Sequence, residues 1–494
     1  MRRPIRLIRN VLLLLIAAIA GLVAVLGFNA LTRTSRQIDV AALPRVAIDI
    51  DAASKRLGHA IRFRTISSFL NPDQNADAFE GMRAHIEASY PAFSAVASRE
   101  IVSKYSLLYT WKGTDPAAKP IALTAHQDVV PIAPGTEAAW QNPPFDGVIQ
   151  DGFIWGRGSW DDKGCVFSIL EAAEQLAKEG FRPTRTIYFA FGHDEEVSGQ
   201  RGAKAMAALL AARGVRLDFL LDEGLLIADG IIKGLDRPAA VIGVAEKGYV
   251  TLQLNLSTVP GHSSLPARES AIGMMSAALA RLEDQRFPAE IRSTTREMFD
   301  ALAPEMDPLN RVVLSNLWLF KPLVQREFAK TPTTDAAIRT TIALTIFNAG
   351  SQDNVLPGQA DATVNFRLLP GDTQDSVVAH VRQVVNNDRI TIAPGPGNSD
   401  PPPVTGTASS SYRALSTTIR EIFPDVVVAP GLSLAATDSR HYAGIADNIF
   451  RFTPVRARAE DLTRFHGTNE RLSVDNYADM IRFYRRLMQN TAGR

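Results

Sequence analysis

The sequence is poor in cysteine and almost balanced in charge, and both features exclude classes of protein. A single cysteine, Cys165, rules out an intramolecular disulfide framework, and its apolar helical surroundings favour a buried structural thiol over a nucleophile. The 53 basic and 52 acidic side chains leave a formal net charge of +1, and no basic run is interleaved with aromatic residues. We therefore expect no nucleic-acid partner.

The chain does contain one long hydrophobic run, close to its N-terminus. Four arginines, Arg2, Arg3, Arg6 and Arg9, precede an uncharged stretch over residues 11–28. About 18 apolar residues at roughly 1.5 Å per residue nearly cross the hydrocarbon layer of a membrane. A cleaved signal peptide would have a shorter apolar core and a small-x-small site, and no convincing Ala-x-Ala follows here. The run favours an uncleaved signal anchor, with a cleaved signal peptide as the alternative.

The arginines also predict an orientation for this segment. Positively charged flanks stay on the cytoplasmic side of a membrane, and more arginines precede the run than follow it. We expect a single transmembrane helix over residues 1–28 and a linker over 29–45. The rest of the chain is then expected to be periplasmic or extracellular.

The remaining sequence is long enough for more than one domain, with 46% hydrophobic residues in a chain of 494. After the linker, short apolar strands alternate with helices, which predicts an α/β sheet with helices on both faces. The pattern then changes to alternating, half-exposed strands with helices between them, which indicates a smaller inserted α+β domain. We expect a catalytic domain over residues 46–246 and 394–494, with the insertion over 247–393.

Acidic residues and histidine follow successive predicted strands. The four segments are His126-Gln-Asp128, Asp161-Asp162 in a glycine-rich turn, Asp194-Glu195-Glu196 and Asp222-Glu223. Each alone is usually a solvated turn, but binding sites in open α/β sheets lie where strands end. Carboxylates crowded on one rim repel one another unless a cation neutralises them. Histidine and carboxylates without cysteine suit catalytic zinc, with cobalt or manganese as substitutes.

These motifs, in this order, make the chain recognisable. His126-x-Asp128-Val-Val-Pro, Gly156-Arg-Gly-x-x-Asp161-Asp-Lys, Asp194-Glu195-Glu196 and Asp222-Glu223-Gly resemble the metallopeptidase family of aminoacylase, carboxypeptidase G and dipeptidase relatives. Gly261-His-Ser-Ser264 and Thr437-Asp-Ser-Arg440 are most similar to its vacuolar carboxypeptidase S and N-acyl-amino-acid synthase/hydrolase branch. The resemblance implies a di-zinc exopeptidase (phosphorylase/hydrolase-like) α/β domain with a mixed sheet and flanking helices. It also implies that the insertion is a ferredoxin-like lid or dimerisation domain.

The resemblance also implies two Zn²⁺ ions per subunit and a set of ligands. These would be His126 on the first ion, Asp161 bridging both, Glu196 and His466 on the second, and either Asp222 or Glu223 on the first. Relatives differ at this last position, and we slightly favour Asp222. A cis peptide bond is implied after Asp161.

Further roles follow from the same resemblance. Asp128 would orient His126, because the aspartate of an extended His-x-Asp can accept from one imidazole nitrogen while the other binds metal. Glu195 would be the general base. His262 would stabilise the oxyanion, often from a partner subunit, which makes a homodimer possible. Asn354 and Arg440 are expected substrate contacts.

We therefore expect a zinc-dependent amidohydrolase that cleaves dipeptides or N-acyl amino acids next to a free carboxylate, or that runs the reverse condensation. One rival is an amino-acid deacetylase of biosynthesis, which an exported, anchored chain argues against. The other is a non-catalytic peptide-binding protein that retains the fold, which the presence of the whole set of ligands and the base argues against.

Overall fold

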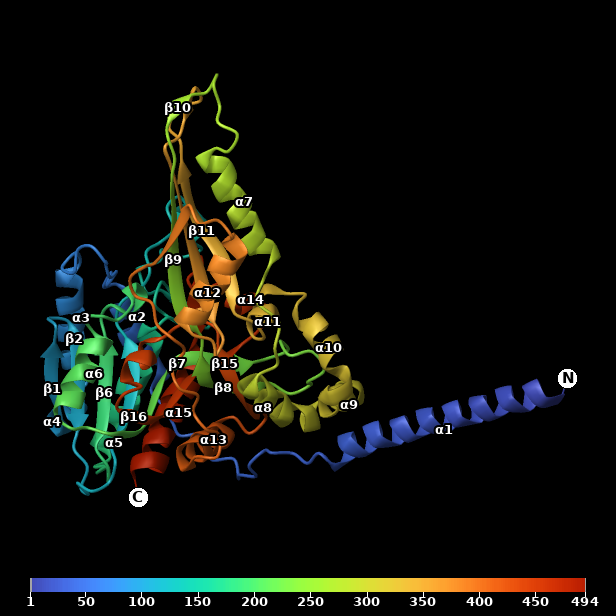
Figure 1. The fold of residues 1–494 in the computed structure, drawn as a ribbon. Coiled ribbons are helices and arrows are strands. Elements are labelled where there is room, and N and C mark those ends of the chain that lie inside the picture. Colours follow the sequence, from blue (N-terminus) through green and yellow to red (C-terminus); the bar gives the residue numbers. More distant parts are fainter. Residues whose placement is uncertain (1, 494) are drawn as a thin grey trace.

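The protein is described here by a computed structural model that covers residues 2–493, so Met1 and Arg494, the ends of two predicted segments, lie outside the described residues. Figure 1 shows three parts: a body built on a large sheet, a narrower part that rises from it, and an N-terminal helix that extends away from both. This helix is α1 (Arg2–Thr32).

The large sheet has eight strands in the order β1-β2-β6-β3-β7-β16-β8-β15. Their bounds are β1 (Ala97–Val102), β2 (Ser106–Trp111), β3 (Ile121–His126), β6 (Ile187–Gly192), β7 (Leu217–Ala228), β8 (Ala239–Glu246), β15 (Val427–Ser433) and β16 (Ala446–Ala457). The β3–β6, β3–β7, β7–β16 and β8–β15 pairs are parallel, whereas β1–β2 and β2–β6 are antiparallel. The predicted mixed sheet is confirmed.

Helices cover both faces of this sheet because its central strands are apolar on both sides. All six residues of β3 are buried. Ile121 and Leu123 pack into the larger core together with α5 (Lys163–Lys178), α2 (Ile50–Ile61) and α15 (Val474–Ala492), while Ala122 faces the core formed with α6 (Ala203–Ala212). A strand buried on both faces is typical of parallel neighbours covered by helices. The remaining helices of this body are α3 (Ala76–Ser89), α4 (Pro91–Val96), α13 (Ser410–Ile422) and α14 (Ala459–Leu462).

The narrower part contains a four-stranded antiparallel sheet in the order β11-β13-β9-β14. Along the chain its elements run β9 (Gly248–Ser257), α7 (Ala271–Asp284), β11 (Thr341–Ala349), β13 (Gln359–Leu368), α12 (Gln374–Val385) and β14 (Ile390–Pro394). This βαββαβ order is ferredoxin-like. Side chains of β13 alternate between buried and half-buried, as expected for a sheet covered by helices on one face.

Two small sheets complete the strands. β10 (Gly261–His262) pairs with β12 (Val355–Leu356), and this ribbon forms the apex in Figure 1. β17 (Arg471–Ser473) pairs with β5 (Phe153–Trp155), which pairs with β4 (Ile149–Gln150).

One helical segment was not anticipated. Between α7 and β11 the chain forms α8 (Ser293–Leu302), α9 (Pro308–Ser315), α10 (Leu317–Phe328) and α11 (Pro332–Ala336). Ala301 and Leu302 of α8 pack against Val427 and Ala429 of β15, the edge strand of the large sheet. Part of the predicted insertion therefore packs on the body.

Candidate metal centre

His126 is the last residue of β3, and its ring is almost completely buried. Its Nδ1 lies 3.0 Å from the carbonyl oxygen of Asp128 and 3.3 Å from that residue's Oδ1. Its Nε2 lies 3.0 Å from Oδ1 of Asp161 and 3.3 Å from Oε1 of Glu223. One ring nitrogen is thus held by its own loop, and the other faces carboxylates from two other segments.

Asp128 connects this loop to the next strand end. Its Oδ1 accepts a hydrogen bond from the backbone N–H of Glu195, and its Oδ2 accepts from the N–H of Glu196 and the hydroxyl of Ser67. Glu195 and Glu196 lie in a short 3₁₀ turn directly after β6. The two glutamates therefore have fixed positions relative to His126.

Asp161 lies in the glycine-rich turn before α5, and the peptide bond that follows it is cis, as the resemblance implied. Its backbone N–H donates to Glu470, whose carboxylate also accepts from the N–H groups of Gly158 and Trp160. Glu470 in turn forms a buried ion pair with Arg157.

His466 comes from a distant part of the chain and meets the same turn. Its Nε2 lies 2.6 Å from Oδ2 of Asp161 and 3.4 Å from Oε2 of Glu196. Its backbone carbonyl accepts from the guanidinium of Arg157, which also binds Glu470. Arg157 and Glu470 thus join the His466 loop to the Asp161 turn.

The structure distinguishes the two acids that follow one another in β7. Asp222 directs both oxygens to protein donors, the hydroxyl of Thr124 at 2.6 Å and the N–H of Ser439 at 2.8 Å. Glu223, and not Asp222, contacts His126. The next position, 224, requires glycine, because a Cβ there would lie 2.7 Å from Cβ of Arg451 and its φ is +146°. The geometry therefore points to Glu223, whereas the sequence slightly favoured Asp222.

Two groups of three residues in the described chain can each converge on one ion. The first is His126, Asp161 and Glu223, and the second is Asp161, Glu196 and His466. In each group the ligand atoms lie within 4.8 Å of one another. Asp161 belongs to both groups, which is the arrangement that a bridging carboxylate requires.

The electrostatics of the centre reflect crowded negative charge. Burial, reinforced by the charge of Asp161, raises the pKa of Glu223 to about 7. Burial also raises the pKa of Glu195 well above its usual range. Hydrogen bonds to Asp161 and Glu196 raise the pKa of His466 to about 10.

Buried oxygen atoms without hydrogen-bond partners also indicate that the cluster lacks a positive charge. Oε1 of Glu196 and Oδ1 of Asp162 are buried without a hydrogen-bond partner. Buried polar atoms without partners are costly, and a bound cation supplies the missing charge and contacts. The residues present therefore fit a pair of divalent ions.

Two predicted residues lie elsewhere. His262 is exposed in the apical ribbon, where its Nδ1 contacts the hydroxyl of Ser264 at 2.8 Å. Asn354 is also exposed, and its backbone carbonyl accepts a hydrogen bond from the N–H of Ser263. The chain thus brings these two residues together with each other and not with the acidic cluster.

Arg440 lies close to the cluster, and it has a neighbour that the sequence did not reveal. Its guanidinium donates to the carbonyl of Ser198, at the end of the turn that carries the two glutamates. This neighbour is Arg367 of β13. Burial and the charge of Arg440 lower the pKa of Arg367, and the negative charge of Glu195 partly opposes this effect. Arg367 stacks on the ring of Tyr249 at 4.7 Å. Arg367 and Tyr249 both lie in alternating strands, and that sequence pattern does not identify either residue as functional.

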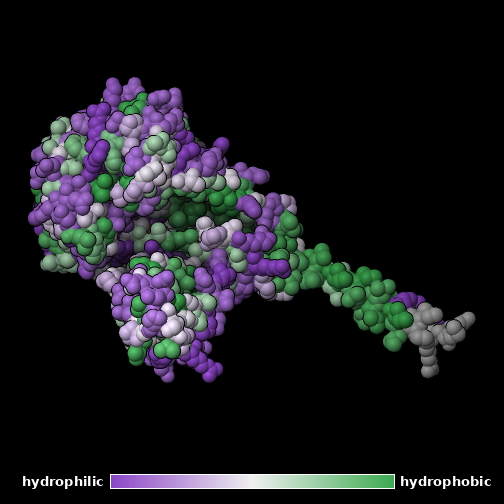
Figure 2. Space-filling view, turned by 90° about the horizontal axis from the view of Figure 1, so that it is seen from above, coloured by the Kyte–Doolittle hydropathy of each residue, from purple (hydrophilic) through white to green (hydrophobic). Residues whose placement is uncertain are grey.

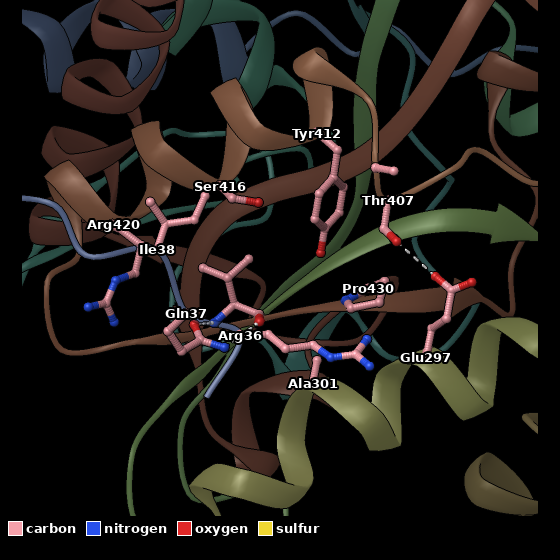
Figure 3. A pocket seen from close by; sticks show the side chains of 12 residues that line it. Arg36, Gln37, Ile38, Glu297, Ala301, Thr407, Tyr412, Ser416, Arg420 and Pro430 are labelled. Atoms are coloured by element: carbon pink, nitrogen blue, oxygen red, sulfur yellow. Dashed lines mark hydrogen bonds between the residues drawn. The ribbon is translucent and has the colours of Figure 1, made fainter. Parts of the chain in front are cut away.

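A partly open cavity of about 250 Å³ lies apart from this centre, because none of the residues assigned to the centre lines it. Figure 3 shows it between the segment after α1, which carries Gln37, and helices α8 and α13. We assign it no chemistry.

A buried cluster of carboxylates and histidines at the strand ends of a mixed sheet, with a ferredoxin-like second part, defines the class as a two-part α/β metallohydrolase. The match to known proteins then identifies the family. The chain belongs to peptidase family M20/M25/M40, whose model matches residues 122–490. It is a hydrolase of the metallopeptidase type.

The chain is similar in sequence to proteins described as carboxypeptidases and as N-acyl-amino-acid hydrolases. It is 42% identical to probable carboxypeptidase S-like 2 of Dictyostelium discoideum, over 98% of this chain and 93% of that protein. It is also 42% identical to the N-fatty-acyl-amino acid synthase/hydrolase PM20D1 of Mus musculus, over 89% of this chain and 88% of the relative.

Solved structures confirm the fold. The M20 metallo-carboxypeptidase Sso-CP2 from Sulfolobus solfataricus superposes with a TM-score of 0.64 at 17% identity, covering 88% of this chain and 98% of the other. The YXEP protein of Bacillus subtilis, described as a dinuclear metal-binding peptidase of family M20, superposes with a TM-score of 0.54 at 15% identity, covering 89% and 98%.

Proposed function

We propose that the protein hydrolyses the amide bond of N-acyl amino acids beside a free carboxylate, with two zinc ions. The observation that carries this proposal is the sharing of Asp161 between two groups of ligand atoms. His126, Asp161 and Glu223 would hold one ion, and Asp161, Glu196 and His466 would hold the other. A protein described as a dinuclear metal-binding peptidase has the same fold.

Zinc, when bound, polarises the scissile carbonyl and acidifies water at neutral pH. Glu195 takes the proton from the attacking water and delivers it to the leaving amine nitrogen. Its backbone is held by Asp128, the residue that also contacts His126, so the base and the ligand share one support.

Recognition of the substrate involves two chemistries. Arg440, with Arg367 beside it, would pair with the free carboxylate of the substrate, because guanidinium groups bind carboxylates through two parallel hydrogen bonds. Figure 2 shows a deep hollow in the molecule whose inner surface is largely hydrophobic. Such a surface suits an acyl chain better than a charged peptide. A relative named for N-fatty-acyl amino acids points the same way.

A second candidate substrate class is a dipeptide of the Gly-X type, favoured by relatives named as carboxypeptidases. Condensation of a fatty acid with an amino acid is the reverse of the first reaction, and a relative is named for both directions. His262 would complete the site from a second copy of the chain, which supports a homodimer through the apical part.

The test is a substrate panel measured on the full-length protein. N-acyl amino acids of increasing chain length and Gly-X dipeptides are compared before chelation, after chelation and after return of zinc. We expect turnover of the acyl substrates, loss with chelator and recovery with zinc, accompanied by about two bound equivalents in metal analysis. Activity that survives complete metal removal would contradict the mechanism. Preference for dipeptides would replace the substrate class but keep the mechanism.

We also propose that α1 is retained as a membrane anchor. Its residues Arg6–Thr32 form a helix long and apolar enough to span a bilayer, a property that a signal sequence shares. A cleaved segment has no reason to be bound by the mature body, yet the end of α1 contacts α9. The intact mass of the protein purified from membranes tests this: a mass without α1 would show cleavage.

A further inference from the structure

The C-terminal end of α1 is attached to the body by a buried polar junction. Asn316, which is completely buried between α9 and α10, accepts a hydrogen bond from the Asn29 amide at 2.8 Å. It donates to the carbonyl oxygen of Leu26 at 3.1 Å. It also accepts from the indole N–H of Trp318 at 3.1 Å. One side chain thus connects α1 to the first turn of α10.

Charged groups reinforce this attachment. Arg311 of α9 donates to the carbonyl oxygens of Ala30 and Arg33, each at 2.8 Å. Arg33 forms an ion pair with Asp300 of α8. A cation that caps the last carbonyls of a helix interacts favourably with the helix dipole.

The segment after α1 is also docked. The side-chain amide of Gln37 donates to the carbonyl of Val428 and accepts from its N–H, so it pairs with the outer edge of β15. Figure 3 shows this segment against the body. α1 therefore leaves the body in one defined direction, as Figure 1 shows.

Beside this exit point, four large apolar side chains face solvent. On α10 the exposed fractions are 63% for Trp318, 40% for Leu319 and 54% for Leu323, and on α9 Leu309 is 72% exposed. Leu319 and Leu323 are four residues apart and so lie on the same side of α10. Figure 2 shows hydrophobic surface continuing from α1 onto the adjoining part of the body.

We propose that this set, Leu309, Trp318, Leu319 and Leu323, is a second membrane contact that inserts into the boundary between lipid headgroups and acyl chains. The proposal rests on α1 being a membrane anchor, because the junction then holds these side chains next to the point where the chain enters the bilayer. Tryptophan is enriched at that depth. The N–H of Trp318 is already bound to Asn316, so its ring can enter the boundary without leaving a polar group unpaired. An amphipathic helix with a Trp and Leu face binds such an interface. Lys321, exposed on the same helix, can reach the headgroups.

The consequence is that the body of the protein has a fixed orientation relative to the membrane. An anchor alone would let the body tumble above the membrane on its linker, whereas a junction plus an inserted face holds one side of the body against the lipid. A bilayer is favoured over a protein partner as the occupant because the apolar surface is continuous with a helix of membrane-spanning length.

The tryptophans of the chain make the test selective. Trp111, Trp140, Trp155 and Trp160 are at most 9% exposed, and α1 contains no tryptophan, so Trp318 is the residue that lipid can reach. Full-length protein is reconstituted in phosphatidylcholine vesicles with lipids brominated near the headgroup or deeper in the chain. We expect quenching of fluorescence, stronger for the shallow bromine, and loss of the quenched component in Trp318→Phe.

Other outcomes overturn the proposal. Trp318 that is quenched by aqueous iodide and not by brominated lipid faces water. Trp318 that neither agent quenches is covered by a second copy or another protein, which cross-linking and mass measurement would distinguish.

A pair of variants separates a specific face from general hydrophobicity. Leu319→Gln with Leu323→Gln should lose most of the lipid quenching of Trp318. The matched control, Val96→Gln with Ile101→Gln, removes two apolar side chains of 44% and 47% exposure at the opposite edge of the large sheet and should change nothing. Equal loss in both pairs would refute the assigned face.

Failure of this proposal is distinguishable from failure of the proposed function and anchor. Amide hydrolysis in detergent solution tests the chemistry without lipid. The intact mass reports whether α1 is present. Chains that keep α1 and hydrolyse substrate, but leave Trp318 unquenched by lipid, would refute the membrane contact alone.

Discussion

The acidic cluster at the strand ends and the apical ribbon use similar residues in opposite ways. His126 is buried and contacts Asp128, Asp161 and Glu223, residues from three segments of the same chain. The side chain of His262 is exposed, and its Nδ1 contacts the hydroxyl of Ser264 in its own turn. A side chain is therefore positioned for chemistry within one chain only where other parts of the fold hold it. The proposed role of the apical histidine therefore requires a second copy of the chain or a closing motion that brings it to the cluster.

The largest expected effect is at Glu195. Glu195→Gln keeps the size and position of the side chain but removes the group that carries the proton. We expect kcat for an N-acyl amino acid to fall by about 10²–10⁴-fold, with metal content unchanged. Rate measurements together with elemental analysis check this.

The matched control is Glu80→Gln, an exposed glutamate of α3 that should leave kcat unchanged. A Glu195 variant with full turnover would show that another group transfers the proton.

The next effect concerns the apex. His262→Ala should lower kcat by about 10²–10³-fold if the side chain stabilises the oxyanion. Mixing this variant with Glu195→Gln should recover activity, because a mixed pair contains one site with both groups intact. Recovery that depends on protein concentration would be the signature of a shared site.

An absence of recovery, with each variant still dimeric, would mean that the histidine acts within one chain or not at all. Unchanged kcat in His262→Ala alone would end its assignment, and the apex would differ from the cluster in function as well as in burial.

A smaller effect distinguishes Asp222 from Glu223, the two adjacent acids of β7. Glu223→Gln should lose about one equivalent of zinc, because it removes a charged ligand. Asp222→Asn should keep both ions and instead lower the thermal unfolding temperature, since its carboxylate accepts from Thr124 and Ser439. Metal analysis and thermal unfolding of both variants decide the matter, and the reverse pattern would restore Asp222 as the ligand.

The smallest effect is a pH dependence of stability at the rim of the cluster. Burial, and then the charge of Arg440, lower the pKa of His441 to about 4. The unfolded chain takes up this proton near pH 6.5, roughly the usual value, so stability is lost as pH falls from there towards the folded value.

His441→Gln keeps a donor for the carbonyl of Ser198 but cannot titrate. Its unfolding temperature should therefore depend less on pH in that window than that of the parent protein. An identical slope in thermal unfolding would show that other groups dominate.

Much of the fold could be predicted because it depends on local pattern. Continuous apolar runs such as residues 121–125 indicate strands buried on both faces, and alternating runs such as 249–256 indicate the second sheet. The packing of α8 on β15 could not be predicted, since it joins segments more than a hundred residues apart through a few ordinary apolar side chains.

The candidate centre was predicted to a similar extent. Motif order placed His126, Asp161, Glu196 and His466 in one site, and the structure brings their side chains together. The choice between Asp222 and Glu223 stayed open because successive strand side chains point to opposite faces of the sheet, and the sequence does not reveal which of the two side chains meets the other ligands. Arg367 was missed because an alternating strand pattern marks burial and not proximity.

The sequence by itself determined the metallopeptidase family and the elements from which the chain is built, because short-range patterns and ordered motifs carry that information. Only the tertiary structure decided that Glu223 and not Asp222 meets His126, that His262 lies apart, and that α1 ends in a junction beside exposed tryptophan. These are relations between distant segments, and they depend on how strands pair and helices pack in three dimensions.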